Sequence, residues 1–179
     1  MTKRNVMITL STSRTEVPED LFDEENDTFP DSFRMALSPL PEPTDLLIEG
    51  RLVTGKNRVE LLYEESELSG MEGSVTSIGF ERETPELISM IRTGSVSTAL
   101  VFEEGKRHVS IYNTPFSDFQ VCVHTLRVKN ELLTRGKIFL DYLIELHGAQ
   151  AEHCRMTVSV RPAQDWDHLS KATSEKEQD

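Results

Sequence analysis

Along most of the chain, hydrophobic and polar residues alternate with the two-residue period of an extended strand. In segment 135–147 one side carries Ile138, Leu140, Tyr142, Ile144 and Leu146, and the other carries Lys137, Asp141, Glu145 and His147. Segment 118–129 repeats the pattern, with Phe119, Val121, Val123 and Thr125 opposite Gln120, Cys122 and His124. Successive side chains of a strand point to opposite faces, so the alternation predicts a sheet with one buried face.

Segments rich in Val, Ile, Thr, Phe and Tyr recur between turn residues, and few windows have a helical period. The predicted strands are 3–12, 44–53, 57–66, 73–82, 86–92, 96–103, 107–113, 118–129, 135–147 and 154–161. The tetrapeptides "TGKN", "RTGS" and "EEGK" separate three pairs of these strands, and each places a glycine where a tight turn needs a positive φ. The chain is therefore predicted to be all-β and antiparallel.

A sheet of this length with one apolar face can close on itself, which removes the exposed edges that favour aggregation. A single antiparallel β-barrel of about 8–10 strands is the preferred architecture, because closure leaves no edge strand unpaired. A two-sheet sandwich is the alternative. The predicted domain spans residues 1–162, followed by a polar tail at 163–179 in which Trp166 is the one evident anchor.

The net charge of -12 is concentrated outside the predicted strands. Segment 14–43 combines most of the acidic excess with five of the eight prolines, which predicts an acidic, Pro-rich insert after the first strand. Two interpretations stay open. The insert is either a mobile acidic loop, or a segment that docks on the domain or on a partner through its apolar residues Phe22, Phe29, Phe33, Met35 and Leu37.

Composition argues against several classes of function. Neither the core nor the acidic segments cluster lysine and arginine as a phosphate backbone requires, so no nucleic-acid partner is expected. No apolar run approaches the roughly 20 residues of a spanning helix, and the N-terminal segment alternates, unlike a signal peptide, so a cytoplasmic protein without a membrane partner is expected. Cys122 and Cys154 lie far apart in apolar strands and are predicted to be reduced, packed thiols.

Motifs for metal and nucleotide chemistry are missing from the sequence. The five histidines show neither HxH nor HxxxH spacing, so no metal site is predicted. The chain has no GxSxG turn, and "TGKN" is too short for a phosphate-binding loop. No cofactor and no catalytic residue are therefore assigned.

The stretch "YEESELSG" carries the most informative polar residues. Alternation continued from Val59 and Leu61 places Tyr63 and Glu65 on the inner face and Glu64 in solvent, so the adjacent glutamates cannot act as a pair. A carboxylate inside a barrel requires a partner, and Arg92, near the end of "LISMIRTG", is the predicted one, through a bidentate guanidinium. A structural polar network and a binding site for a polar ligand group are both compatible with this pair.

The stretch "YNTPFSDF" also has two interpretations. Pro115 forces Thr114 toward an extended conformation and removes a backbone donor, which is typical of a corner or bulge between strands. Alternatively, Tyr112, Thr114 and Phe116 lie at the mouth of the barrel, where an aromatic wall and two hydroxyls orient a ligand.

The succession "VMITLSTS", "LLYEESELSGMEGSVTSI", "MIRTGSVSTALVFEEGKRHVSIYNTPFSDFQVCVHT" and "GKIFLDYLIEL" resembles the YwiB-like family of bacterial proteins of unassigned function. The resemblance covers residues 3–13 and 44–161 and implies a calycin-like or lipocalin-like β-barrel that holds a ligand, with no assigned catalytic residue. The positions that match the family pattern are Tyr63, Glu64, Glu65, Gly70, Thr76, Arg92, Gly94, Tyr112, Thr114, Pro115, Thr125 and Tyr142. The long acidic insert departs from it, and so does Ser117, where the family tends toward glycine.

Three functions follow from these observations. The leading hypothesis is a non-enzymatic barrel that binds a small, partly apolar ligand inside. Its interior would be lined by residues such as Val121, Phe102, Ile138 and Leu140, and its expected ligand-binding residues are Tyr63, Glu65, Arg92, Tyr112, Thr114, Phe116 and Tyr142. The alternative is a protein-interaction or structural module, in which the acidic insert docks on a protein partner or a second subunit. An enzyme that uses Glu65 as acid or base is the third.

Overall fold

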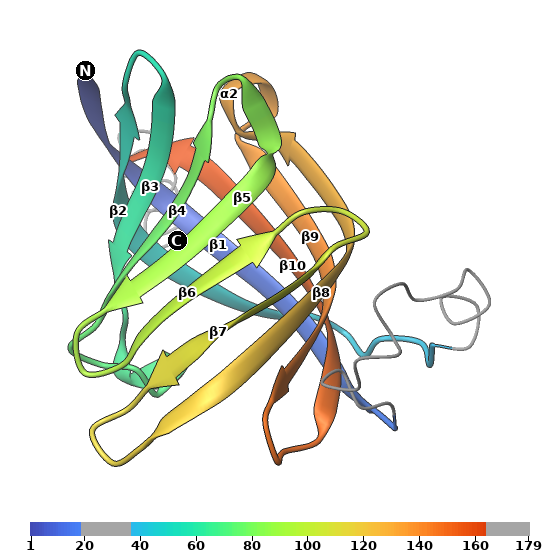
Figure 1. Ribbon diagram of the computed structural model, residues 1–179. Helices are drawn as coiled ribbons and strands as arrows, with labels where there is room; N and C mark the ends of the chain where they lie inside the picture. The colour runs from blue at the N-terminus through green and yellow to red at the C-terminus, as the bar shows by residue number, and fades with distance from the viewer. Residues whose placement is uncertain (19–36, 164–179) are drawn as a thin grey trace, which may run out of the picture.

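The chain folds into one closed antiparallel β-barrel, in which each strand pairs with its neighbours in sequence and β1 pairs with β10 to complete the circle (Figure 1). The computed structural model describes residues 1–18 and 37–163. The strands are β1 (Thr2–Val17), β2 (Thr44–Thr54), β3 (Arg58–Glu64), β4 (Val75–Glu81), β5 (Thr84–Thr93), β6 (Ser97–Phe102), β7 (Arg107–Asn113), β8 (Asp118–Glu131), β9 (Lys137–Leu146) and β10 (Ala151–Pro162). The predicted barrel is confirmed, and the sandwich alternative is wrong.

Each predicted strand corresponds to one in the structure, but the start of the insert was placed too early. Strand β1 continues to Val17, and Thr15 and Val17 pair with His153 and Ala151 of β10. Residues 14–17 therefore belong to the barrel wall and not to the insert. The apolar residues Phe22, Phe29, Phe33 and Met35, like Trp166, lie outside the described residues.

The three predicted hairpins are all present, and two of their glycines have the predicted backbone. Gly94 has a φ of 137° and Gly105 a φ of 76°. Gly55 is not among the described glycines with positive φ, so that part of the prediction is wrong. The β2–β3 turn is instead closed by a hydrogen bond of 2.8 Å from the Gly55 amide to the Arg58 carbonyl.

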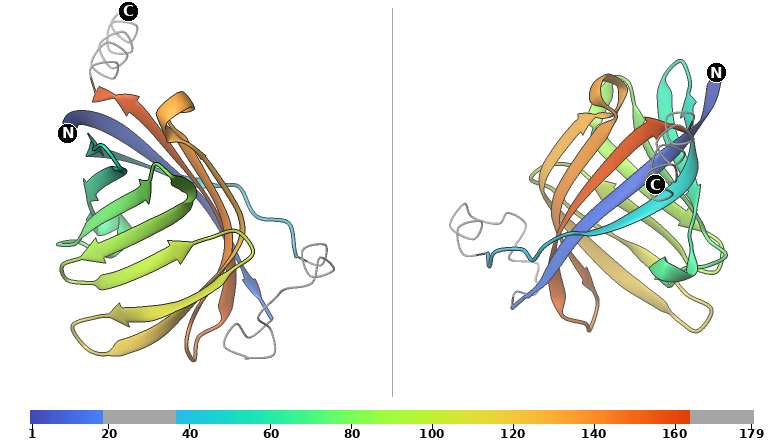
Figure 2. Two further views of the ribbon diagram at one scale, coloured as in Figure 1. Left: turned by 45° about the horizontal axis from the view of Figure 1, so that its top comes forward. Right: turned by 180° about the vertical axis from the view of Figure 1, so that it is seen from behind.

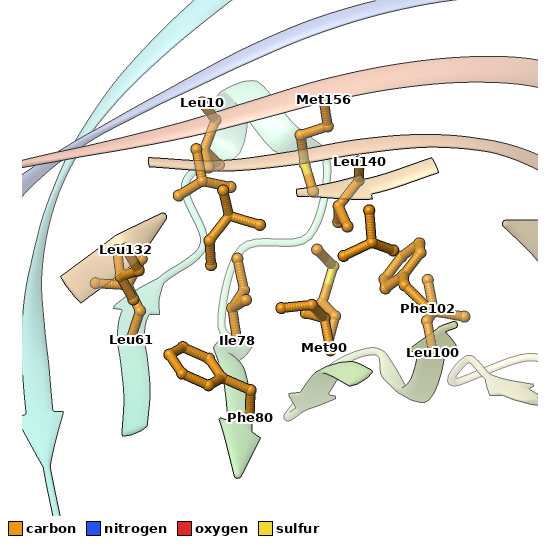
Figure 3. Packing of buried hydrophobic residues seen from close by; sticks show 14 of the residues in the cluster. Leu10, Leu61, Ile78, Phe80, Met90, Leu100, Phe102, Leu132, Leu140 and Met156 are labelled. Carbon is orange, nitrogen blue, oxygen red and sulfur yellow. The ribbon is translucent and has the colours of Figure 1, made fainter. Parts of the chain in front are cut away.

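One end of the barrel interior is closed by apolar packing. Val59, Phe80, Ile88, Phe102, Ile138 and Val158 lie at this end and are almost fully buried. The short helix α2 (Leu132–Arg135) contributes the buried Leu132 to the same cluster. Figure 3 shows side chains of this cluster in the interior of the barrel, among them Leu61, Met90, Phe102, Leu132 and Leu140. We refer to this as the closed end.

A second apolar cluster lies on the outer surface of the barrel wall. Its buried residues are Val17, Cys122, Leu126, Leu143 and Ala151, with the half-buried Leu37 packed against them. The outward-facing His124 and Glu145 are buried as well. Alternation correctly placed Cys122, His124 and Glu145 on the face opposite the core, and the structure adds that part of this outer face is buried as well.

The described residues contain only very short helices. Besides α2, the 3-10 turn η2 (Glu67–Ser69) lies in the β3–β4 connection. Among the residues described, no helix has the length and apolar character needed to cross a membrane. Both cysteines are buried and free, as predicted.

Candidate functional site

Glu65 and Arg92 form a buried ion pair, as the sequence predicted. Arg92 Nη2 lies 3.0 Å from Glu65 Oε1, and the two side chains are 11% and 2% exposed. Arg92 Nε donates to the same oxygen at 3.1 Å, and the Thr76 hydroxyl donates to it at 2.5 Å. Both guanidinium nitrogens thus meet one carboxylate oxygen, whereas the predicted fork would engage both oxygens.

The pairing of strands places these residues in a row across five neighbouring strands. Tyr63 of β3 is opposite Thr76 of β4, and Thr76 is opposite Arg92 of β5. Arg92 is opposite Thr98 of β6, which in turn is opposite Tyr112 of β7. We call these five residues, together with Glu65, the polar belt. Because cross-strand partners share a face, the belt lines the inner side of the wall.

Thr98 has the least satisfied side chain in the belt. It is 6% exposed, and its hydroxyl makes no hydrogen bond within the part of the chain that the structure describes. A buried hydroxyl without a partner is unfavourable, and most buried polar groups have one. The Thr125 hydroxyl, further into the barrel, is buried and unpaired in the same sense. The belt therefore includes hydrogen-bonding capacity that the described protein groups leave unused.

The phenol of Tyr63 is held in its neutral form. Burial raises its pKa far above the ordinary value, and the negative charge of Glu65 acts in the same direction. The charge of Arg92 and hydrogen bonds with Thr76 and Arg92 oppose this rise only in part. A neutral phenol next to the ion pair both donates and accepts hydrogen bonds.

Tyr142 lies apart from the belt, on the other wall of the barrel. It is opposite Thr125 of β8 and Cys154 of β10, and its ring packs edge-on against Phe102 with 4.9 Å between centroids. Burial raises the pKa of Tyr142 strongly. Burial also raises the pKa of the neighbouring Cys154 thiol, to about 12. Tyr142 therefore lies in the apolar part of the interior, where the apolar part of the ligand was predicted to bind.

Thr114 and Phe116 lie in the β7–β8 turn. The Thr114 hydroxyl donates to the Ser117 carbonyl at 2.8 Å and accepts hydrogen bonds from the amides of Phe116 and Ser117. Phe116 is 95% exposed at the tip of the hairpin. The corner predicted from Pro115 is confirmed, and the structure does not bring these two side chains to Glu65 and Arg92. Ser117 completes this turn without a positive φ.

The loops next to the belt are joined to each other. The Ser74 and Ser95 hydroxyls lie 3.0 Å apart, and the Val96 amide donates to Ser74 Oγ at 3.0 Å. These bonds connect the β3–β4 and β5–β6 loops. From the β3–β4 loop, Met71 accepts a hydrogen bond from the Tyr112 hydroxyl through its sulfur at 3.9 Å. The Glu65 amide donates to the Ser74 carbonyl at 2.8 Å, so the joined loops hold the backbone of Glu65 as well as the ring of Tyr112.

The end of the barrel that carries the belt is less completely buried than the closed end. Inward-facing side chains here remain partly accessible: Leu46, Ile48, Tyr112, Ile144 and Leu146. Phe119, opposite Tyr112, is 41% exposed. Apolar side chains thus surround the polar belt at this end, which we call the open end.

Strands β6 and β7 form the weakest junction in the wall. They pair only at Ser97–Asn113 and Thr98–Tyr112, while β5–β6 and β7–β8 pair over most of their lengths. The two strands diverge from this point in the views of Figures 1 and 2. We call the unpaired stretch, residues 99–102 against 107–111, the seam. Its β7 side has inverted polarity, because His108, Ser110 and Tyr112 face inward while Val109 and Ile111 are exposed outside.

A separate group of charged residues, His153, Asp141 and Arg155, lies away from the belt. On the outer wall, His153 Nε2 lies 2.6 Å from Asp141 Oδ1, and Arg155 Nη2 lies 2.9 Å from Asp141 Oδ2. Burial acts to raise the pKa of Asp141, but the hydrogen bonds from His153 and Arg155 outweigh it and hold this pKa below the ordinary value. Among the described residues, no group of three or more His, Cys, Asp or Glu side chains is arranged to hold a metal ion.

Comparison with known proteins supports the fold. A family model described as "Domain of unknown function (DUF1934)" matches residues 38–158. The structure is similar to the crystal structure of the ywiB protein from Bacillus subtilis, with a TM-score of 0.58 and 14% identity over 88% of this chain and 92% of that one. At this identity the likeness concerns the fold alone. A search of curated proteins found no match.

Proposed function

We propose that this chain, which belongs to the DUF1934 family of YwiB-like β-barrel proteins, binds a small, partly apolar molecule inside its barrel and is not an enzyme. The observation that carries the proposal is the polar belt at the open end, with its buried Thr98 hydroxyl that has no hydrogen-bond partner among the described residues. The polar group of the ligand meets Arg92, Thr98 and Tyr112, and its apolar part lies against the inward-facing side chains.

The size of the barrel supports an internal ligand. Eight strands enclose an interior just wide enough for side chains or one small ligand, and the diameter grows with the number of strands. This wall has ten strands. Sites of this kind typically combine an apolar lining with a few convergent polar groups, as the open end does. Glu65, fixed by Thr76 and Arg92, serves here to orient the guanidinium.

Replacing Thr98 by valine is expected to separate stability from binding. Thr98→Val removes the unpaired hydroxyl at nearly constant volume, so the unliganded protein becomes more stable by about 1 kcal/mol. The same change weakens binding of N-phenyl-1-naphthylamine, a fluorescent probe with an apolar body and one N–H group, by about fivefold. Urea unfolding and fluorescence titration measure the two effects.

Thr76→Val is the matched control, because the Thr76 hydroxyl donates to Glu65. This variant is expected to lose about 1–3 kcal/mol of stability. Loss of stability in Thr98→Val, or unchanged probe affinity in a fully folded Thr98→Val protein, would contradict the role given to this hydroxyl. If the wild-type protein fails to bind the probe at a saturable site, this probe does not support an internal site.

The seam provides the expected route for ligand exchange, because separating β6 from β7 breaks few backbone hydrogen bonds. Joining the outward-facing positions of Ala99→Cys and Ile111→Cys with a short bismaleimide is expected to slow probe release by about tenfold without changing the fold. Stopped-flow fluorescence measures the rate. The native thiols are buried, and the raised pKa of Cys154 further protects it from the reagent.

The control cross-link joins Ile91→Cys to Ala99→Cys, which are already register partners in β5 and β6. It adds the same chemistry to the same surface but does not span the seam, so release is expected to stay at the wild-type rate. Equal rates in both cross-linked proteins would show that the ligand leaves by another path.

A further inference from the structure

We infer that the polar end of the ligand is an uncharged hydrogen-bonding group, such as an alcohol or amide, and not a carboxylate or phosphate. The inference rests on the proposed function and names the chemical class that the same site takes. Two observations support it: the charges at the belt are balanced, and the other polar groups of the belt are uncharged hydroxyls.

The charges at the belt already neutralise each other. Arg92 directs Nε and Nη2 at Glu65, and both side chains are nearly inaccessible to solvent. A ligand anion placed beside them would give two negative charges and one positive charge in a buried space. An unpaired buried charge is strongly unfavourable, whereas a hydroxyl or amide only needs hydrogen-bond partners.

Two further contacts between basic and acidic side chains lie near the interior, and both are more exposed to solvent than Glu65 and Arg92. His108, on the inner face of β7, lies 3.3 Å from Glu103. On the opposite wall Arg14 lies 3.7 Å from Glu152, and both affect the pKa of Tyr142. None of these pairs supplies a surplus positive charge for an anion. The described interior is therefore electrostatically matched to a neutral ligand.

The uncharged groups of the belt suit an alcohol or amide. The Thr98 hydroxyl is buried without a described partner and can donate or accept. Within the part of the chain that the structure describes, the Tyr112 hydroxyl donates to a thioether sulfur at 3.9 Å. Sulfur is a weak acceptor, so a ligand oxygen in its place would form a stronger hydrogen bond. Tyr63 stays neutral because burial raises its pKa. Together these hydroxyls can satisfy both the donor and the acceptor of a neutral head group.

The test compares 1-decanol with decanoate, two ligands of equal chain length, as competitors of bound N-phenyl-1-naphthylamine at pH 8. In the wild-type protein decanol is expected to displace the probe at a lower concentration than decanoate. Since an alcohol is also the more hydrophobic of the two, the decisive quantity is how a mutation changes their ratio. Glu65→Gln leaves Arg92 without a counter-charge, so decanoate is expected to gain about tenfold relative to decanol.

Two further variants show whether the ratio follows charge. Glu60→Gln removes a carboxylate of β3 that pairs with Arg58 on the outer face, and its ratio is expected to match the wild type. The double variant Glu65→Gln/Arg92→Met restores neutrality and is expected to keep the preference for decanol. This second variant also tests the inference if Glu65→Gln alone does not fold.

Several outcomes would overturn the inference. The first is that decanoate competes as well as decanol in the wild-type protein. The second is that the ratio of decanol to decanoate affinity is unchanged in folded Glu65→Gln. The third is that the relative affinity for decanoate rises as much in the neutral double variant as in Glu65→Gln. These outcomes require probe binding and displacement, so they differ from failure of the proposed function, in which neither competitor displaces a probe from the barrel.

Discussion

Arg92→Met is expected to lower the free energy of unfolding by about 3–5 kcal/mol, because it leaves the carboxylate of Glu65 buried without its guanidinium. For a chain of this length the loss corresponds to a fall in melting temperature of roughly 10 °C. Glu65 is 2% exposed, so solvent does not replace the missing partner. Thermal and urea unfolding with far-UV circular dichroism measure the change.

The double variant Glu65→Gln/Arg92→Met is expected to recover most of this loss, since replacing both partners removes the uncompensated charge. The coupling energy of the cycle is then about 2 kcal/mol or more. Arg58→Met is the matched control, because Arg58 pairs with Glu60 and Glu81 on the more exposed outer wall. It should lose no more than about 1 kcal/mol. A coupling energy near zero would mean that the Glu65–Arg92 contact does not stabilise the fold.

Gly94→Ala is expected to destabilise the protein by about 3 kcal/mol, through both backbone strain and a steric clash. Gly94 has a φ of 137°, which residues with a Cβ rarely adopt, and an added Cβ would lie 2.3 Å from the Gly73 carbonyl oxygen and 2.7 Å from Ser74 Cα. Since these atoms belong to the backbone of the β3–β4 loop, they cannot move aside easily. Urea unfolding of the purified variant measures the effect.

Gly105→Ala separates the strain from the clash. Gly105 also has a positive φ, of 76°, but an added Cβ there meets nothing within 4 Å. This variant is expected to lose only about 1 kcal/mol, the cost of a left-handed backbone. Equal losses at the two glycines would indicate that the β3–β4 and β5–β6 loops do not pack closely.

The strands could be predicted because a barrel wall imposes a two-residue period on its sequence. One inward face, at Ile138, Leu140 and Tyr142, was enough to assign the sides of β9. The end of β1 was missed since Thr15 and Val17 lie in an acidic, Pro-rich context, and their pairing with β10 decides their conformation. The outer cluster around Cys122 and Leu143 was missed for a similar reason, because burial outside the barrel depends on contacts that alternation does not encode.

The Glu65–Arg92 pair could be predicted from strand alternation and electrostatics together. A carboxylate on the inner face requires a cation, and Arg92 was the best candidate in the predicted core. Thr98 was not predicted, because its position between Arg92 and Tyr112 depends on strand register. Thr114 was predicted as a ligand-binding residue because it carries a hydroxyl. In the structure this hydroxyl accepts hydrogen bonds from amides of its own turn.

On this proposal a small molecule binds on the inner side of the wall at the polar belt. The most direct measurement is a set of intermolecular nuclear Overhauser effects between N-phenyl-1-naphthylamine and methyl groups labelled with ¹³C in the wild-type protein. We predict contacts from the bound probe to the methyls of Thr98 and Leu100, which face inward on β6, and none to Val109 and Ile111, which are exposed on β7. Contacts confined to Val109 and Ile111 would place the probe outside the barrel and contradict the account.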